Sequence, residues 1–190
     1  MRRRSQTETA VLGALSVEPM TGYAVREAIR DVLGHFWSES FGQIYPTLAE
    51  LERRGYVRRS GSRRAGSSSF TITASGRRRL KELLMQPIQA EPPRNGLMLR
   101  LFFGRQLGPD ACRSLVEGAK ADAERRLEEF QAIRDEIERD DAHAKDRPYW
   151  LLTVAAGEHG ARAAIAWADE ALEAMDQISS LRDEPHGRST

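Results

Sequence analysis

Apolar residues recur at helical spacing in three stretches of the first half of the chain. The spacing predicts helices over residues 7–17, 22–33 and 40–54. Two short strands are expected at residues 56–59 and 70–73, because β-branched and aromatic residues are frequent there and the second stretch alternates apolar with polar positions. A fourth helix is expected over residues 74–85, followed by a linker at 86–93 that is rich in Pro and Gln.

The start of the third helix is ambiguous. Ser40 and Gln43 fit a capping box, in which each side chain binds the backbone N–H of the other residue. A helix that begins at Ser40 would place Pro46 beyond its first turn, where a proline costs a backbone hydrogen bond. The helix therefore begins later or bends at the proline, and the sequence does not decide between the two.

The second half of the chain has a helical pattern throughout. Helices are predicted over residues 97–103, 109–141 and 148–181. In the middle helix the apolar positions from Val116 to Ile137 recur at a mean spacing of about 3.5 residues, which is the period of a coiled coil and predicts a dimer. We expect a first domain at residues 1–88, a helical dimerisation domain at 94–182 and a disordered tail at 183–190.

Charge divides the chain in the same place as the domains. Residues 1–90 carry 15 Lys and Arg against 8 Asp and Glu, whereas residues 91–190 carry 14 against 20. This distribution indicates that the first half meets a polyanion and the second does not. A single cysteine and the lack of a long apolar run favour a cytoplasmic protein that does not enter membranes.

The order of elements is that of a winged helix-turn-helix with a two-stranded wing, so a mostly α (α+β) fold is expected. The third helix would enter the major groove of DNA, which presents the full base code. Gln43, Tyr45 and Thr47 lie off its apolar stripe and are candidates for base contacts. Arg63 and Arg64, in the Gly- and Ser-rich loop between the strands, are candidates for phosphate contacts in the wing.

Several stretches of residues 7–85 resemble the PadR family of bacterial regulators. They are Thr21–Tyr23, Ser40–Leu48, Leu51–Val57 and Phe70–Arg77. The region from about Gly96 to Met175, with Trp167, resembles the long C-terminal domain of the larger PadR subfamily. The wing departs from the family pattern, because Ser68 and Ser69 stand where a Tyr or Arg is common.

This resemblance implies a homodimeric regulator, usually a repressor, that binds a palindromic operator in double-stranded DNA and has no catalytic site. It also implies that Tyr23 and Ser40 approach backbone phosphates, whereas Tyr23 and Tyr45 could equally fill the seam between helices. Arg77, Arg78 and Arg79 are interpreted as a solvent-exposed helix face.

Two other functions stay open. In one, a small-molecule effector binds the helical domain in a pocket near Phe102, Trp150 and Trp167. In the other, the chain is a protein-interaction module that no longer binds DNA. No enzyme is expected, since no nucleophile–base pair or cofactor loop is present, and no metal is expected because the four histidines are isolated in sequence.

Overall fold

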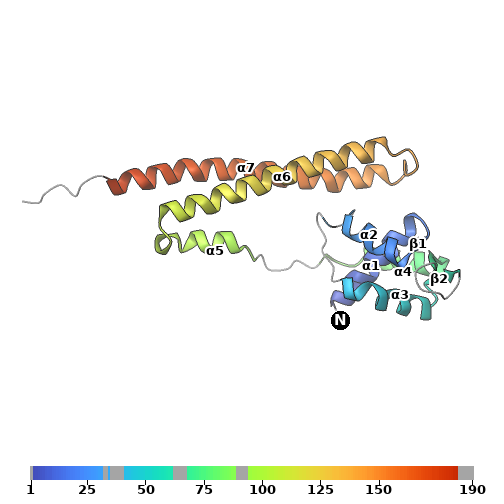
Figure 1. Ribbon diagram of the computed structural model, residues 1–190. Coiled ribbons are helices and arrows are strands. Elements are labelled where there is room, and N and C mark those ends of the chain that lie inside the picture. The colour runs from blue at the N-terminus through green and yellow to red at the C-terminus, as the bar shows by residue number, and fades with distance from the viewer. Residues whose placement is uncertain (1, 32–33, 35–40, 62–67, 89–93, 184–190) are drawn as a thin grey trace, which may run out of the picture. The chain divides into compact units, whose positions relative to one another are not determined.

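The computed structural model describes residues 2–31, 34, 41–61, 68–88 and 94–183. The chain divides into two compact units, Met1–Ala90 and Glu91–Thr190 (Figure 1). The predicted mostly helical fold is confirmed. The expectation that the wing has two strands is incomplete, since a third strand joins the sheet.

The first unit packs four helices around a small antiparallel sheet. The helices are α1 (Arg2–Val17), α2 (Gly22–Asp31), α3 (Ile44–Arg53) and α4 (Ala74–Leu84). The strands are β1 (Met20–Thr21), β2 (Val57–Ser60) and β3 (Ser69–Ile72), in the order β1-β3-β2. Strand β1 pairs Met20 with Phe70 and Thr21 with Ser69. A strand of two residues is too short to show alternation, and so it leaves no signal in the sequence.

The predicted apolar stripes meet in one core. Its fully buried members include Val11, Leu12, Leu15, Val25, Ile29, Ile44, Leu48 and Leu51. Helix α1 extends further toward the N-terminus than predicted, because residues 2–6 carry no apolar stripe by which a helix could be recognised. It is the element against which α2, α3, β3 and α4 all pack.

The beginning of α3 resolves the ambiguity at Pro46. A 3-10 turn over Phe41–Gln43 precedes the α-helix, which begins at Ile44. Pro46 therefore lies in the first turn, where its missing N–H has no helical acceptor and costs nothing. Gln43 is the N-cap residue of α3 and makes no side-chain capping bond to this helix. Ser40, the other member of the predicted capping box, lies outside the described residues.

The end of α3 is a Schellman motif. Gly55 has a φ of 71°, the left-handed conformation that glycine adopts without a steric penalty. The N–H of Tyr56 donates to the carbonyl of Leu51 at 2.9 Å, and the N–H of Gly55 donates to that of Glu52 at 3.0 Å. The chain thus turns directly from the helix into β2.

The second unit is an antiparallel helical hairpin with a short helix at its open end. Its elements are α5 (Gly96–Phe102), α6 (Pro109–Arg139) and α7 (Arg147–Asp183). Asp183, predicted as the first residue of the tail, is the last residue of α7, and residues 184–190 lie outside the described part. Cross-hairpin ion pairs join Arg113 to Asp176, Lys120 to Asp169 and Arg134 to Glu158.

The apolar stripe of α6 packs against α7 of the same chain. Val116 and Ala123 are fully buried, and Phe130 lies against Gly157. The coiled-coil spacing is therefore used within one chain, and this spacing by itself does not indicate a partner. The assignment of this helical unit to dimerisation stays a prediction.

A buried carboxylate lies at the same level of the hairpin. Arg134 Nε donates to Glu158 at 2.7 Å, and Arg162 contacts the other carboxylate oxygen at 3.3 Å. The hydrogen bond from Arg134 lowers the pKa of Glu158 and outweighs burial, which acts in the opposite direction. The ionised glutamate fixes α6 against α7 beside the contact of Phe130 with Gly157.

The contact between Gly157 and Phe130 predicts that Gly157→Ala destabilises the hairpin. A Cβ at position 157 would lie 2.3 Å from the Phe130 ring, so the ring or the helices must move. We expect the free energy of unfolding to fall by about 1–2 kcal/mol, within the usual range for overpacking. Urea denaturation of the full chain followed by circular dichroism measures this change.

Gly160→Ala is the matched control, because a Cβ there meets nothing within 4 Å on the same helix. It should leave stability unchanged or raise it by up to about 1 kcal/mol through helix propensity. Equal effects of the two substitutions would contradict the proposed contact.

Candidate nucleic-acid interface

The outer side of α3 is a strip of residues spaced four apart. Tyr45, Ala49 and Arg53 are all exposed, on the side opposite to Ile44, Leu48 and Leu51. Tyr45 is 53% exposed. Arg53 forms a bidentate ion pair with Glu50: its Nε donates to Oε2 at 2.8 Å, and its Nη2 donates to Oε1 at 2.6 Å. Sequence reasoning missed Ala49, although its spacing from Tyr45 marks it once the helix is known to begin at Ile44.

Gln43 and Thr47 lie on a different side of α3 from Tyr45. Together with Glu8 of α1 and with Glu50 and Arg54, they line a cavity of about 120 Å³. Gln43 is exposed and Thr47 is half-buried. The three residues predicted to contact bases therefore belong to two neighbouring strips of the surface of α3.

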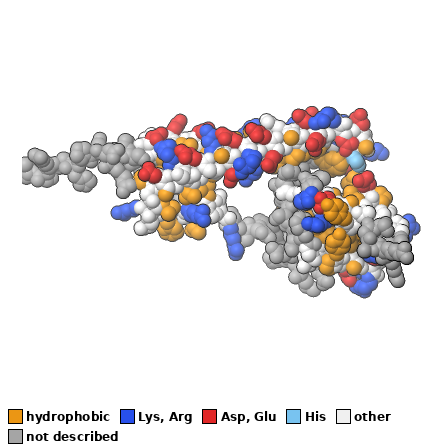
Figure 2. Space-filling model, in the orientation of Figure 1, with side chains coloured by type: hydrophobic (Ala, Val, Ile, Leu, Met, Phe, Trp, Pro, Cys, Tyr) orange, Lys and Arg blue, Asp and Glu red, His pale blue; other side chains and the backbone are white. Residues whose placement is uncertain are grey.

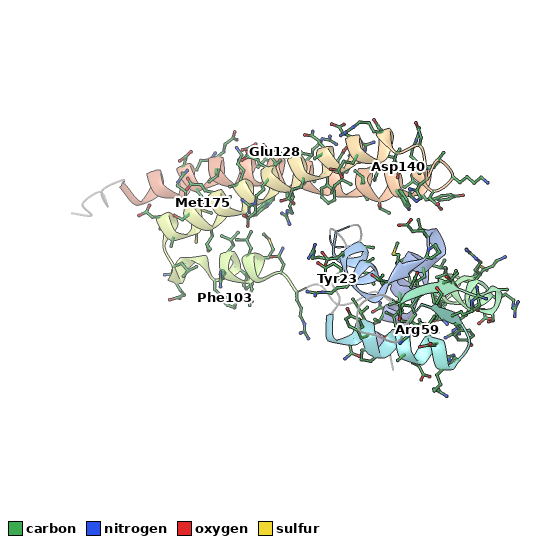
Figure 3. The ribbon with its side chains drawn as sticks, turned by 45° about the vertical axis from the view of Figure 1, so that its right-hand side comes forward. Tyr23, Arg59, Phe103, Glu128, Asp140 and Met175 are labelled. Atoms are coloured by element: carbon green, nitrogen blue, oxygen red, sulfur yellow. The ribbon has the colours of Figure 1, made fainter. Side chains whose placement is uncertain are left out.

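Tyr23 stands at the start of α2 and is 59% exposed (Figure 3). Its ring therefore does not fill the seam between helices. Thr21 holds this end of α2 in two ways: its side-chain oxygen accepts from the N–H of Ala24 at 3.1 Å, and its backbone pairs with Ser69. Through this residue, β3 of the wing and the start of α2 are joined directly.

The wing presents more basic residues than the sequence suggested. Arg63 and Arg64 lie outside the described residues, between the end of β2 and the start of β3. Strand β2 itself exposes Arg58 and Arg59, which sequence reasoning did not select. Arg59 lies over the ring of Phe70 at 4.9 Å and pairs with Glu52 at 3.4 Å (Figure 3). The sequence indicated their exposure, because Arg58 and Arg59 directly follow the apolar Val57 within the predicted strand.

A partly buried network of ion pairs stabilises the C-terminal end of α3. Arg79 of α4 donates to Glu8 of α1 at 2.9 Å, and Arg54 contacts the same carboxylate oxygen at 3.5 Å. The side chain of Glu8 is only 12% exposed. The hydrogen bond with Glu8 raises the pKa of Arg79 against the effect of burial. Arg54 follows the last residue of α3, so the network links this end of the helix to α1 and α4.

The interpretation of Arg77–Arg79 as a solvent-exposed face is therefore wrong for Arg79, which is half-buried and belongs to the network with Glu8. Arg77 and Arg78 are exposed as expected, and Arg77 also donates to the backbone oxygen of Ser16 at 3.3 Å. Helix periodicity did not reveal the partners, because they lie on α1, far away in the sequence.

The residues predicted to line an effector pocket do not come together within one chain. Trp150 and Trp167 are half-buried on the same helix, and 17 residues of helix separate them by about 25 Å. Trp150 lies beside the ring of His143, at 5.4 Å between centroids. Phe102 is 82% exposed and is the last residue of α5, which precedes the start of α6. Trp150, in contrast, lies in α7 shortly after the end of α6.

Neither a metal site nor a membrane span is found in the described part of the chain. Among these residues no group of three or more His, Cys, Asp or Glu is placed to hold a metal ion. The described helices include none that has both the length and the apolar character needed to cross a bilayer.

Two family models match the two units. Residues 11–82 match the transcriptional regulator PadR-like family, and residues 93–176 match the virulence activator alpha C-terminal region. The chain carries a PadR-like domain followed by a virulence activator alpha C-terminal region. The prediction of a PadR-like transcriptional regulator is confirmed by these matches.

Curated relatives and solved structures match along most of the chain. The negative transcriptional regulator PadR of Bacillus subtilis is 24% identical over 177 residues, which is 88% of this chain and 96% of the relative. The structure of that PadR with operator DNA has a TM-score of 0.74 at 22% identity, over 88% of this chain and 98% of the other. Its structure with p-coumaric acid has a TM-score of 0.72 at 23% identity, over 89% and 98%.

A virulence activator has a similar structure as well. The virulence activator AphA of Vibrio cholerae has a TM-score of 0.69 at 22% identity, over 90% of this chain and 99% of the other. At these identities the solved structures establish the winged helix fold with its long C-terminal helices.

The ion network predicts that Glu8→Gln destabilises the PadR-like domain. Loss of the charge leaves Arg79 and Arg54 without their shared carboxylate in a partly buried setting. We expect the free energy of unfolding to fall by roughly 1–3 kcal/mol, as for other charged hydrogen bonds of limited exposure. Chemical denaturation of the full chain measures it.

Glu82→Gln provides the control, since Glu82 pairs with the same Arg79 at 3.4 Å but is well exposed. Its replacement should change stability little, as is usual for surface ion pairs. If both variants lose the same stability, Glu8 has no special role.

Proposed function

We propose that this PadR-like regulator binds operator DNA as a homodimer and represses transcription by occupying a promoter. The observation that carries the proposal is the joint placement of two surfaces in one unit. Helix α3 exposes Tyr45 and Ala49 on its outer strip, and the wing carries Arg58 and Arg59 on the adjoining strand. A helix of this kind fits the major groove, while wing cations suit phosphates.

The comparisons support both DNA binding and repression of transcription. A structure of the B. subtilis PadR holds operator DNA, and that relative is a negative regulator. AphA is an activator, so repression is the part of the proposal that depends on the promoter. We assign phosphate contacts to Tyr23, Ser40, Arg63 and Arg64, and base contacts to Gln43, Tyr45 and Thr47. The regulator acts by binding rather than by catalysis, and in the cytoplasm.

The second unit supports dimerisation through an apolar surface rather than through the seam of α6. Large apolar side chains of α5 and the turn after it are exposed in the single chain: Met98, Leu99, Phe102, Phe103 and Leu107 (Figure 2). A helix of seven residues with no buried side chain gains little stability by itself. A second copy that covers this surface would stabilise it and would place two α3 helices on a two-fold symmetric site. We assign residues 1–88 to DNA binding and 94–182 to dimerisation.

A small-molecule effector is the second candidate function. The observation that favours it is the structure of the B. subtilis PadR with p-coumaric acid. In this chain Trp150 and Trp167 are about 25 Å apart along α7, so an effector would meet only one of the two tryptophans within a single chain. Tryptophan fluorescence during titration with aromatic acids tests this idea.

Selection of bound duplexes from a random DNA pool tests the proposed function. Enrichment of a palindromic sequence supports a dimeric DNA-binding regulator. A pool that remains random favours instead a protein-interaction module that no longer binds DNA. The selected operator then serves as the probe for the measurements below.

The wing and the recognition helix should respond differently to salt. Arg63→Ala combined with Arg64→Ala removes phosphate contacts, so affinity for the operator and for scrambled DNA should fall by similar factors. The slope of log affinity against log salt should decrease by about one for each lost contact. Gln43→Ala should keep the slope and lose about 1–3 kcal/mol on the operator alone.

Fluorescence anisotropy at several salt concentrations measures these slopes. An unchanged slope in the double arginine variant would remove the wing from the binding site. Gln43 makes no side-chain capping bond to α3, and the melting temperature of the Gln43 variant is measured beside its affinity to separate base contact from stability.

The exposed surface of α5 predicts that Phe102→Glu weakens the dimer. A charge at the centre of this surface must be desolvated without a partner when the second copy covers it. Sedimentation velocity at micromolar concentration should show a shift toward monomer. Leu84→Glu on α4 is the control, because Leu84 is similarly exposed but lies in the other unit. A Phe102 variant that sediments as the wild type would place the interface elsewhere.

A further inference from the structure

Gly22 and Tyr45 meet where α2 begins and α3 exposes its outer strip. Gly22 is the first residue of α2. A Cβ built on it would lie 2.8 Å from Cε1 and 3.4 Å from Cδ1 of Tyr45. Non-bonded carbons in proteins prefer about 3.5–4.0 Å, so the Tyr45 ring occupies the space of a side chain at position 22. The glycine forms a notch into which the ring fits.

This notch has rigid walls. The same Cβ position lies 3.5 Å from Leu48 Cδ1, and Leu48 is fully buried in the core. The preceding residue, Thr21, pairs with Ser69 of β3 and caps α2. The backbone of Gly22 is therefore held by the sheet on one side and by the helix on the other. In contrast, Tyr45 is 53% exposed, so its ring has space to move toward solvent.

We propose that Gly22 is a positioning residue for DNA recognition, which sets the orientation of the Tyr45 ring on the recognition helix. The proposal rests on the proposed function, since it concerns the surface that is assigned to DNA. A methyl group at position 22 would crowd only the far end of an exposed side chain. The least costly response is an outward turn of the ring, into the space that the bases would occupy. The substitution should therefore harm recognition and spare the fold.

Substitutions of two other glycines in the same unit serve as controls, because they distinguish a loss of DNA recognition from a loss of stability. A Cβ at Gly76 would lie 2.1 Å from the backbone oxygen of Tyr56, and backbone cannot move away easily. A Cβ at Gly13 would meet nothing within 4 Å. Gly76→Ala is thus the reference for damage to the fold, and Gly13→Ala is the neutral control in a helix.

The test compares these variants of the full chain on the selected operator and on scrambled DNA of equal length. Gly22→Ala should keep the melting temperature of the wild type and lose roughly tenfold in operator affinity, as expected for one base contact. Its affinity for scrambled DNA should change less than twofold. Gly13→Ala should match the wild type in DNA affinity and melt at the same or a higher temperature through helix propensity, whereas Gly76→Ala should melt at a lower temperature.

A double-mutant cycle with Tyr45→Ala identifies the route of the effect. In the Tyr45→Ala background, Gly22→Ala should have no further effect on operator affinity, because no ring remains to be displaced. Additive losses would overturn the proposal, since Gly22 would then act without Tyr45. A lowered melting temperature of Gly22→Ala would overturn it too.

The outcome also distinguishes this proposal from the proposed function. If the wild type binds a selected operator and Gly22→Ala binds it equally well, only the role of Gly22 fails. If the wild type selects no sequence, DNA recognition fails and the role of Gly22 fails with it.

Discussion

The packing of Ile44, Leu48 and Leu51 against α1 is the constraint on which the surface proposed to bind DNA depends. These three side chains are almost completely buried, and they fix the rotation of α3 about its own axis. Once that rotation is set, the side of the helix that carries Tyr45 and Ala49 must face outward. The Schellman motif at Gly55 and the network around Glu8 then hold the far end of the helix. The identity of the outward residues can vary without cost to this core, which is how one fold serves different operators.

Much of the first unit was predictable because its signals are local. Apolar periodicity placed the core side of each helix, and glycine after α3 marked its end. The start of α3 was harder, since a 3-10 turn and an α-helix have similar short-range patterns; Pro46 pointed to the answer without deciding it. Contacts across the fold were not predictable. The partner of Arg79 lies on α1, and strand β1 becomes a strand only by pairing with β3.

The second unit shows that an apolar pattern can be correct without identifying the partner that covers it. The spacing of about 3.5 residues from Val116 to Ile137 does describe a seam between two helices. The second helix is α7 of the same chain, because the short connection after α6 returns the chain antiparallel to itself. Sequence periodicity reports that a partner helix exists and does not report which one. The two tryptophans are a different case. Trp150 and Trp167 are 17 residues apart on one helix, so the helical rise alone already separates them by about 25 Å.

The junction at Thr21 has a consequence for the engineering of this protein. Because one residue both closes the sheet and caps α2, the wing and the start of α2 are a single mechanical piece, and α3 rests on that piece at Gly22. In a chimera that replaces only α3, the foreign residue at position 45 would pack against Gly22, whose surroundings fit the Tyr45 ring. The natural module for transplantation is therefore discontinuous: it comprises the recognition helix together with residues 20–22 and the strand that pairs with them.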